Sequence, residues 1–276
     1  MPIRDLLLFI TSYPQCTPGW AISGSASLAA TLGARLSTAL YQTHFRRMSN
    51  WLADKLVQAN ELAASENARS RDAARSLLAE FASTVDESVL GEQILLSGGS
   101  VVDPGELSRI ARLHDLTIMP IQPGCEYEDI AEELIFQSGR PVLLLTRPDK
   151  NGPRLETVCV AWDGSRSATR ALADAIPLCK LASTVQVLIV IGDKNLDVDR
   201  SDIVRHLALH QVNADVIEVP ANGRDAGVAL MKHSVEAGAD LLVMGAYGHS
   251  RTREFVLGGA TRSVIGQPLL PVLFAH

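Results

Sequence analysis

The sequence contains only four cysteines, and their spacing excludes the common cysteine-based sites. Cys16, Cys125, Cys159 and Cys179 form no Cys-x-x-Cys pair and do not cluster with histidines. Structural zinc sites and the disulfide frameworks of small secreted proteins need such clustering. The sequence therefore predicts reduced thiols in a cytosolic protein and no metal site.

Long apolar runs and an excess of basic residues are also missing. The apolar run from Leu6 to Ile10 stops at Thr11-Ser12-Tyr13-Pro14, which is too short for most export signals and favours a strand. No stretch approaches the length of a membrane span. The net charge of -6 argues against a general nucleic-acid or membrane surface, because such surfaces are usually basic. We therefore expect a cytoplasmic protein with neither class of partner.

No catalytic constellation can be assembled from the sequence. The seven histidines show no regular spacing, and no Ser/His/Asp or paired-carboxylate arrangement is evident. The sequence therefore favours binding over catalysis.

What the chain does contain is an internal repeat. Residues 115–119 (Asp-Leu-Thr-Ile-Met) match residues 240–244 (Asp-Leu-Leu-Val-Met), and a Pro-Val-Leu strand follows each, at Pro141 and Pro271. Repetition at this scale indicates two related domains of about 140 residues each. We place them at residues 1–147 and 155–276, joined by a polar linker at 148–154 that is rich in turn formers.

Both halves alternate strands with helices. In the first half we expect strands at 5–10, 34–41, 88–96, 115–121 and 141–146, with helices at 20–32, 51–83, 104–113 and 126–137. In the second half we expect strands at 157–162, 184–191, 215–219, 240–244 and 271–275, with helices at 167–181, 199–211, 225–237 and 259–266. This order predicts an α/β fold of two tandem five-stranded parallel open sheets, Rossmann-like, with helices on both faces.

One stretch near the end of the chain has the pattern of an anion-binding loop. The strand at 240–244 runs into Gly245 and Gly248, a nine-residue arm follows, and Gly258-Gly259 then opens a helix. Free amides in a glycine turn and the positive end of a helix together favour a phosphate. Basic side chains gather in the same stretch, at Arg251, Arg253 and Arg262. The alternative is that the glycines only shape a strand-to-helix turn.

That spacing (Gly, two residues, Gly, nine residues, Gly) resembles the nucleotide loop of the universal stress protein family. ATP-binding members usually carry Ser or Thr directly after the last glycine. Here Gly259 stands at that place and Thr261 follows two residues later. The resemblance is strong over residues 155–276 and weaker over 1–147.

The stretch from Val158 to Ser165 resembles the first strand of the same family, which typically ends in an acidic residue, here Asp163. In doubly wound sheets the first and fourth strands flank the switch point at which ligands bind, so Asp163 and the glycine loop should face one crevice. The resemblance implies that Asp163 contacts adenosine, that Ala161 and Val190 give backbone or apolar contacts, and that Gly245, Gly248, Gly258, Gly259 and Thr261 surround the phosphates. Their neighbours Trp162, Met244, His249, Arg251 and Ala260 complete the candidate nucleotide site. Two alternatives stay open: Asp163 caps the following helix, and Trp162 belongs to the core.

The first half lacks these features. Pro120 and Pro123 fall opposite Gly245 and Gly248, and proline has no N–H to offer an anion. Thr11 or Ser12 takes the place of Asp163, and acidic residues occupy the arm. We therefore expect a degenerate first domain. In the family, domains pair through their fifth strands, so we also expect the two halves to form a pseudo-dimer within one chain.

Together these features predict a stress-response protein that binds ATP in its C-terminal domain and signals through nucleotide occupancy. Whether Mg²⁺ accompanies the ATP is left open, as are protein partners and a homodimer. The alternatives are a nucleotide-independent scaffold and a slow ATPase or phosphotransferase.

Overall fold

The structure is a computed structural model of the chain. It describes residues 2–45, 53–99, 102–121, 127–147, 155–192, 200–246 and 259–276, with the backbone alone for 53–59. The linker expected at 148–154 lies outside these residues, so the two domain boundaries stay predictions.

The described strands form one ten-stranded sheet in the order β3-β2-β1-β4-β5-β10-β9-β6-β7-β8. The strands of the first half are β1 (Asp5–Thr11), β2 (Arg35–Thr43), β3 (Leu90–Gly98), β4 (Leu116–Pro120) and β5 (Val142–Leu145). Those of the second half are β6 (Thr157–Ala161), β7 (Thr184–Ile191), β8 (Asp215–Pro220), β9 (Leu241–Gly245) and β10 (Val272–Ala275). Each half is parallel throughout and has the same internal order, as the repeat predicts.

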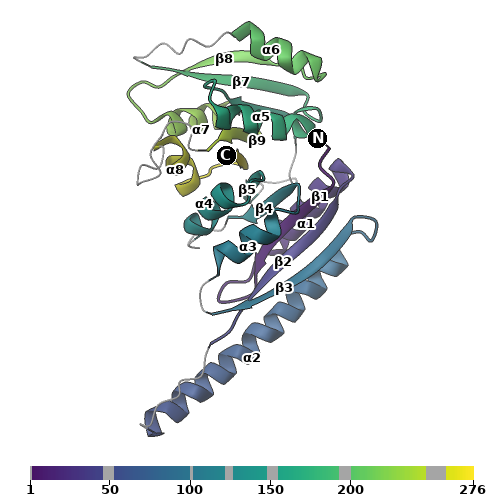
Figure 1. The fold of residues 1–276 in the computed structure, drawn as a ribbon, viewed down its shortest axis with the longest axis vertical. Helices are drawn as coiled ribbons and strands as arrows, with labels where there is room; N and C mark the ends of the chain where they lie inside the picture. Colours follow the sequence, from purple (N-terminus) through teal and green to yellow (C-terminus); the bar gives the residue numbers. More distant parts are fainter. Residues whose placement is uncertain are drawn as a thin grey trace.

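Helices cover both faces of the sheet (Figure 1). On one face, the core cluster joins α1 (Gly19–Leu32), α2 (Ala53–Thr84), α5 (Arg166–Cys179) and α6 (Arg200–Leu209) to the strands. On the other face, a second cluster joins α3 (Pro104–Ala111), α4 (Glu128–Gln137), α7 (Ala226–Glu236) and α8 (Gly259–Gly266). Each cluster contains residues of both halves, so each face of the sheet has one continuous core. The strands are apolar on both sides because both faces are covered.

The two halves join through their fifth strands. β5 and β10 pair antiparallel, with Val272 opposite Leu144 and Phe274 opposite Val142. Phe274 is fully buried at this junction. The pairing confirms the expected intrachain pseudo-dimer and turns two five-stranded sheets into one continuous sheet. Both fifth-strand edges, which would otherwise expose unpaired backbone groups, are thereby covered.

The repeat extends to individual hydrogen bonds. Asp115 Oδ2 accepts from the backbone N–H groups of Arg4 (2.8 Å) and Asp5 (3.2 Å). Asp240 Oδ2 accepts from those of Glu156 and Thr157, both at 2.9 Å. Each aspartate therefore ties the start of a fourth strand to the start of a first strand, which explains why aspartate precedes both matched strands.

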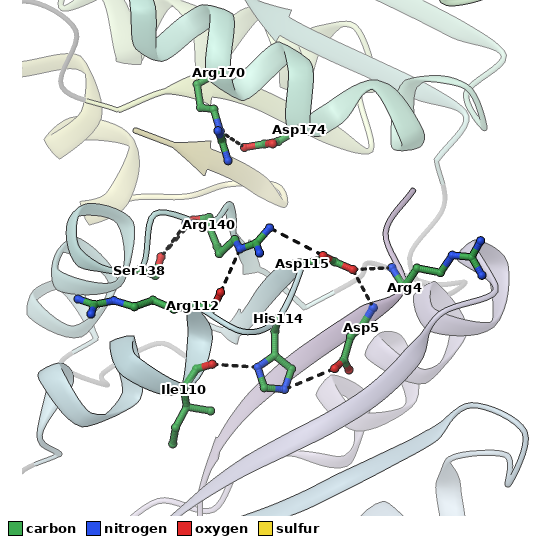
Figure 2. A network of polar contacts seen from close by, with 10 residues as sticks. All are labelled: Arg4, Asp5, Ile110, Arg112, His114, Asp115, Ser138, Arg140, Arg170 and Asp174. Carbon is green, nitrogen blue, oxygen red and sulfur yellow. Dashed lines mark hydrogen bonds and ion pairs between the residues drawn. The ribbon is translucent and has the colours of Figure 1, made fainter. Parts of the chain in front are cut away.

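Figure 2 shows the network around the first of these aspartates. Arg140 lies 3.8 Å from Asp115 Oδ1, and His114 contacts both the Ile110 carbonyl (3.0 Å) and the Asp5 carboxylate (3.8 Å). The side chains of this network connect backbone segments at the beginning of strands, so we interpret the network as structural. No group of three or more His, Cys, Asp or Glu side chains among the described residues could hold a metal ion.

Every strand and helix expected from the sequence is present, with ends that differ by a few residues. The main asymmetry is α2, which has 32 residues whereas its counterpart α6 has 10. In Figure 1, α2 extends well beyond the sheet at the bottom of the molecule. Within the described residues, none of the helices combines the length and the apolar composition needed to cross a bilayer.

Candidate functional site

The candidate site lies where the second half of the sheet changes its direction of connection. From β6 the chain passes through α5 to β7 on one side, and it later returns to β9 on the other side of β6. Ligands of open α/β sheets bind beyond the carboxyl ends of strands at such a switch point. Asp163 follows the end of β6, and Gly245 ends β9. The topology thus places these two predicted residues at the carboxyl ends of adjacent strands.

Asp163 begins the turn that leads from β6 into α5. Its Oδ1 accepts from Ser165 N at 2.9 Å, and Gly164 supplies the positive φ of 73° that this turn needs. The helix cap itself is Ser165, whose Oγ accepts from Ala168 N at 3.1 Å. Capping α5 therefore does not require Asp163. The half-buried carboxylate supports the turn and lies at the switch point.

Four other candidate residues belong mainly to the core. Ala161 and Val190 pack against the cluster on the α7 and α8 face, and Met244 is buried within it. Trp162, directly after β6, packs against the cluster on the opposite face. Its backbone N–H donates to Leu188 O at 2.9 Å, and its buried indole Nε1 has no hydrogen-bond partner within the described residues. This geometry agrees with the core alternative for Trp162.

Gly245 is required by packing. A Cβ added there would collide with the backbone of Ser167 and Ala168 in the first turn of α5. The missing side chain therefore lets β9 and the beginning of α5 lie against each other. This close approach supports the structural explanation of Gly245, and it brings the amide end of α5 to the switch point.

A carboxylate from the start of α7 faces the start of α8. Asp225 caps α7 through Oδ1, which accepts from Gly227 N at 2.9 Å. Its Oδ2 faces Gly259, where an added Cβ would lie only 2.7 Å away. A negative side chain next to a helix N-terminus stabilises the helix but opposes an anionic ligand there. Asp225 begins the helix expected at 225–237, but its contact with Gly259 across 34 positions has no sequence signal.

The two residues after Gly259 point into the domain. Ala260 packs against the core, and a Cβ on Gly227 would collide with its backbone carbonyl. Thr261 is only 2% exposed. Its side chain is therefore buried in this structure, and its predicted role at the phosphates stays a prediction.

The rest of the predicted loop lies outside the described residues. This applies to Gly248, His249, Arg251 and Gly258, and also to Arg253. Arg262 is described and exposed on α8. Burial and the nearby Asp129 raise the pKa of Glu132 on α4, while the Arg262 guanidinium acts in the opposite direction. Arg262 is therefore within electrostatic range of the first half of the chain.

The matching place in the first half is filled by its own chain. Thr11 N donates to Thr17 Oγ1 (2.9 Å), and Thr17 N returns a bond to Thr11 O (2.9 Å), which closes the turn after β1. Ser12 is buried and bonds to Tyr41 O through its hydroxyl. Pro120 ends β4 where Gly245 ends β9. Pro123 lies outside the described residues.

Comparison with known proteins shows which proteins the chain resembles in sequence and in fold. No protein-family model matches the chain. A universal stress protein of Synechocystis sp. is 27% identical over 146 residues, which cover 51% of this chain and 49% of that protein. The chain thus matches about half the length of this curated relative. The crystal structure of a universal stress protein from Archaeoglobus fulgidus matches 98% of this chain and 97% of its own, with a TM-score of 0.69 and 14% identity.

The chain is similar to universal stress proteins, in sequence over about half its length and in fold over nearly all of it. The resemblance recognised from the sequence is thereby confirmed, as is the tandem α/β fold. A further universal stress protein, solved in complex with cAMP, matches 44% of this chain and 97% of its own, at 23% identity and a TM-score of 0.34. So low a TM-score does not carry its ligand over to this chain, and the case for a nucleotide rests on the residues described above.

Proposed function

We propose that this chain is a cytosolic tandem universal stress protein whose second half binds an adenine nucleotide, with ATP as the first candidate. It would act in a stress response through nucleotide-dependent interaction. The observation that carries the proposal is the position of Asp163 at the switch point between β6 and β9, with the amide end of α5 beside Gly245. A carboxylate suits ribose hydroxyls or an adenine amino group, and would be repelled by phosphate.

The contrast between the halves supports one site per chain. The turn after β1 bonds to itself through Thr11 and Thr17, and Pro120 stands where Gly245 stands in the second half. Proline offers no amide to an anion. The first half would then serve as the partner domain that covers the β10 edge.

Asp225 and Thr261 bear on which part of the nucleotide contributes affinity. A carboxylate beside Gly259 weakens any phosphate contact at the start of α8, and the Thr261 side chain is buried. We therefore expect the adenosine end, near Asp163, to supply most of the affinity. Removing the charge in an Asp225→Asn variant keeps the cap on α7 and should tighten ATP binding.

Isothermal titration of the full chain with Mg-ATP tests the proposal. We expect one site, and Gly258→Val in the phosphate loop should weaken binding there. Asp163→Ala should weaken binding roughly 10- to 100-fold, the value of a hydrogen bond to a charged group. Asp163→Asn keeps an oxygen that can accept from Ser165 N but removes the negative charge. It therefore distinguishes the effect of the charge on binding from the effect of the turn. The matched control is Ser12→Ala at the equivalent position of the first half, which should bind like the native chain.

Two equal sites, or equal loss in Asp163→Ala and Ser12→Ala, would contradict the assignment. The absence of any binding, with an unchanged melting temperature in millimolar Mg-ATP, would favour the second candidate, a nucleotide-independent scaffold. The features that favour this scaffold are Asp225 against Gly259 and the buried Thr261.

A further inference from the structure

A groove lies between the two halves, away from the candidate nucleotide site. It has a volume of about 520 Å³. The first half contributes Ile3, just before β1, and Leu32, at the end of α1. The second half contributes Ile176 and Pro177 near the end of α5, and His210 just after α6. The groove therefore exists only because the two halves are joined.

The groove and the candidate nucleotide site use different ends of the strands. Ile3, Leu32 and His210 lie in segments that lead into β1, β2 and β8. Asp163 and Gly245 lie at the opposite, carboxyl ends of β6 and β9. No residue is shared, so a ligand in the groove is independent of the proposed nucleotide function.

The walls of the groove are apolar and only partly covered. Ile3 is 7% exposed, Leu32 and Pro177 are half-buried, and Leu181 on the rim is 42% exposed. Covering exposed apolar surface is favourable by about 25 cal/mol per Å². Cavities of this size and lining at domain interfaces are typical small-molecule sites. An alkyl chain would fit such walls.

Among the described residues that line the groove, Lys180 is the charged side chain. His210 is the other ionisable residue of this described lining, which contains no carboxylate. Lys180 forms no ion pair with any described residue. His210 stacks edge-on with His206, at 4.9 Å between ring centroids, and forms no ion pair with a described carboxylate. An ammonium group beside an apolar surface complements a ligand with an anionic head and an apolar tail.

We propose that this groove, defined by Ile3, Leu32, Ile176, Pro177, Lys180 and His210, binds an amphipathic carboxylate with an unbranched alkyl chain. The carboxylate accepts from Lys180 Nζ, with the His210 ring beside it, and the chain lies on Ile176, Pro177 and Leu32. A neutral alcohol of the same length lacks the ionic contact, and a short carboxylate lacks the apolar one.

Titration calorimetry of the full chain with decanoate, below its micelle concentration, tests the proposal. We expect one site, bound at least fivefold more tightly than decanol, with no measurable binding of acetate. Lys180→Met keeps the length of the side chain and removes its charge. It should weaken decanoate binding roughly fivefold or more and leave decanol binding unchanged, since it removes a charge-assisted hydrogen bond. The matched control is Lys232→Met, an exposed lysine on α7, which should bind decanoate like the native chain.

Ile176→Asp adds a carboxylate to the wall and should abolish decanoate binding, while ATP titration and thermal melting of the same variant show that the chain is folded. Equal affinity of the Lys180→Met and Lys232→Met variants, decanol binding as tight as decanoate, or no heat with decanoate would each overturn the proposal. Loss of ATP binding in Asp163→Ala leaves the decanoate result unchanged, so the two proposals fail separately.

Discussion

Gly245→Ala gives the sharpest test of the geometry at the switch point. The added methyl group would collide with the main chain of Ser167 and Ala168, which cannot rotate away as a flexible side chain could. Either α5 must shift or β9 must move within the sheet. Overpacking of this kind costs about 1–3 kcal/mol, and a clash with backbone falls in the upper part of that range.

The loss should appear in thermal unfolding followed by circular dichroism. At roughly 2–4 °C per kcal/mol for chains of this size, about 2–3 kcal/mol corresponds to a midpoint lower by roughly 4–12 °C. Gly192→Ala is the matched control, because a Cβ there meets nothing within 4 Å and the residue follows β7 of the same half. We expect its midpoint to stay close to that of the native chain. If the two variants melted together, β9 and α5 would not be in contact as described, and a role for Gly245 in ligand binding alone would be the better explanation.

Three further predictions concern the contacts between the two halves and the buried thiol of Cys179. Phe274→Ala removes a fully buried side chain at the β5–β10 junction and should lower the free energy of unfolding by about 3–5 kcal/mol, measured by urea unfolding. A loss below about 1 kcal/mol would mean that the junction is not packed. Tyr127, just before α4, donates a 2.9 Å hydrogen bond from its hydroxyl to the Ile265 carbonyl on α8. Tyr127→Phe removes this bond and should lower the free energy of unfolding by about 1 kcal/mol in the same assay. An unchanged stability would mean that the two halves do not contact each other in this way. Burial raises the pKa of Cys179 from 9.0 to about 12, so the unfolded chain loses this proton at a lower pH than the folded chain. Stability should therefore fall as pH rises from 9 towards 12, and less steeply in Cys179→Ala; parallel pH profiles of the two proteins would contradict the assignment.

The order of elements followed from local patterns. Apolar runs bounded by turn formers marked the ten strands, and the matched aspartates 115 and 240 marked the repeat. The pairing of the fifth strands was predicted from family resemblance, since no pattern in residues 142–145 or 272–275 specifies a partner strand, and its antiparallel direction came from the structure. Strand ends shifted by one to three residues, as at β3, because hydrogen bonding to β2 decides where a strand begins.

The candidate site was harder to predict because its decisive contacts join distant positions. The sequence identified Asp163 and Gly245, but not that Gly245 lies against α5 or that Asp225 faces Gly259. The burial of Thr261 likewise depends on how α8 docks on the sheet. The groove between the halves has no sequence signal, since Ile3, Leu32, Ile176 and His210 meet only when both repeats are folded and joined.

The covalent union of the two repeats has a consequence for how they can differ. Two identical subunits must carry the same mutations, so a residue that suits one role is imposed on both copies. In this chain the β5–β10 pairing is intramolecular, so dilution does not dissociate it by mass action as it would two separate subunits. Each repeat is then free to diverge from the other, while their stoichiometry stays fixed at one to one.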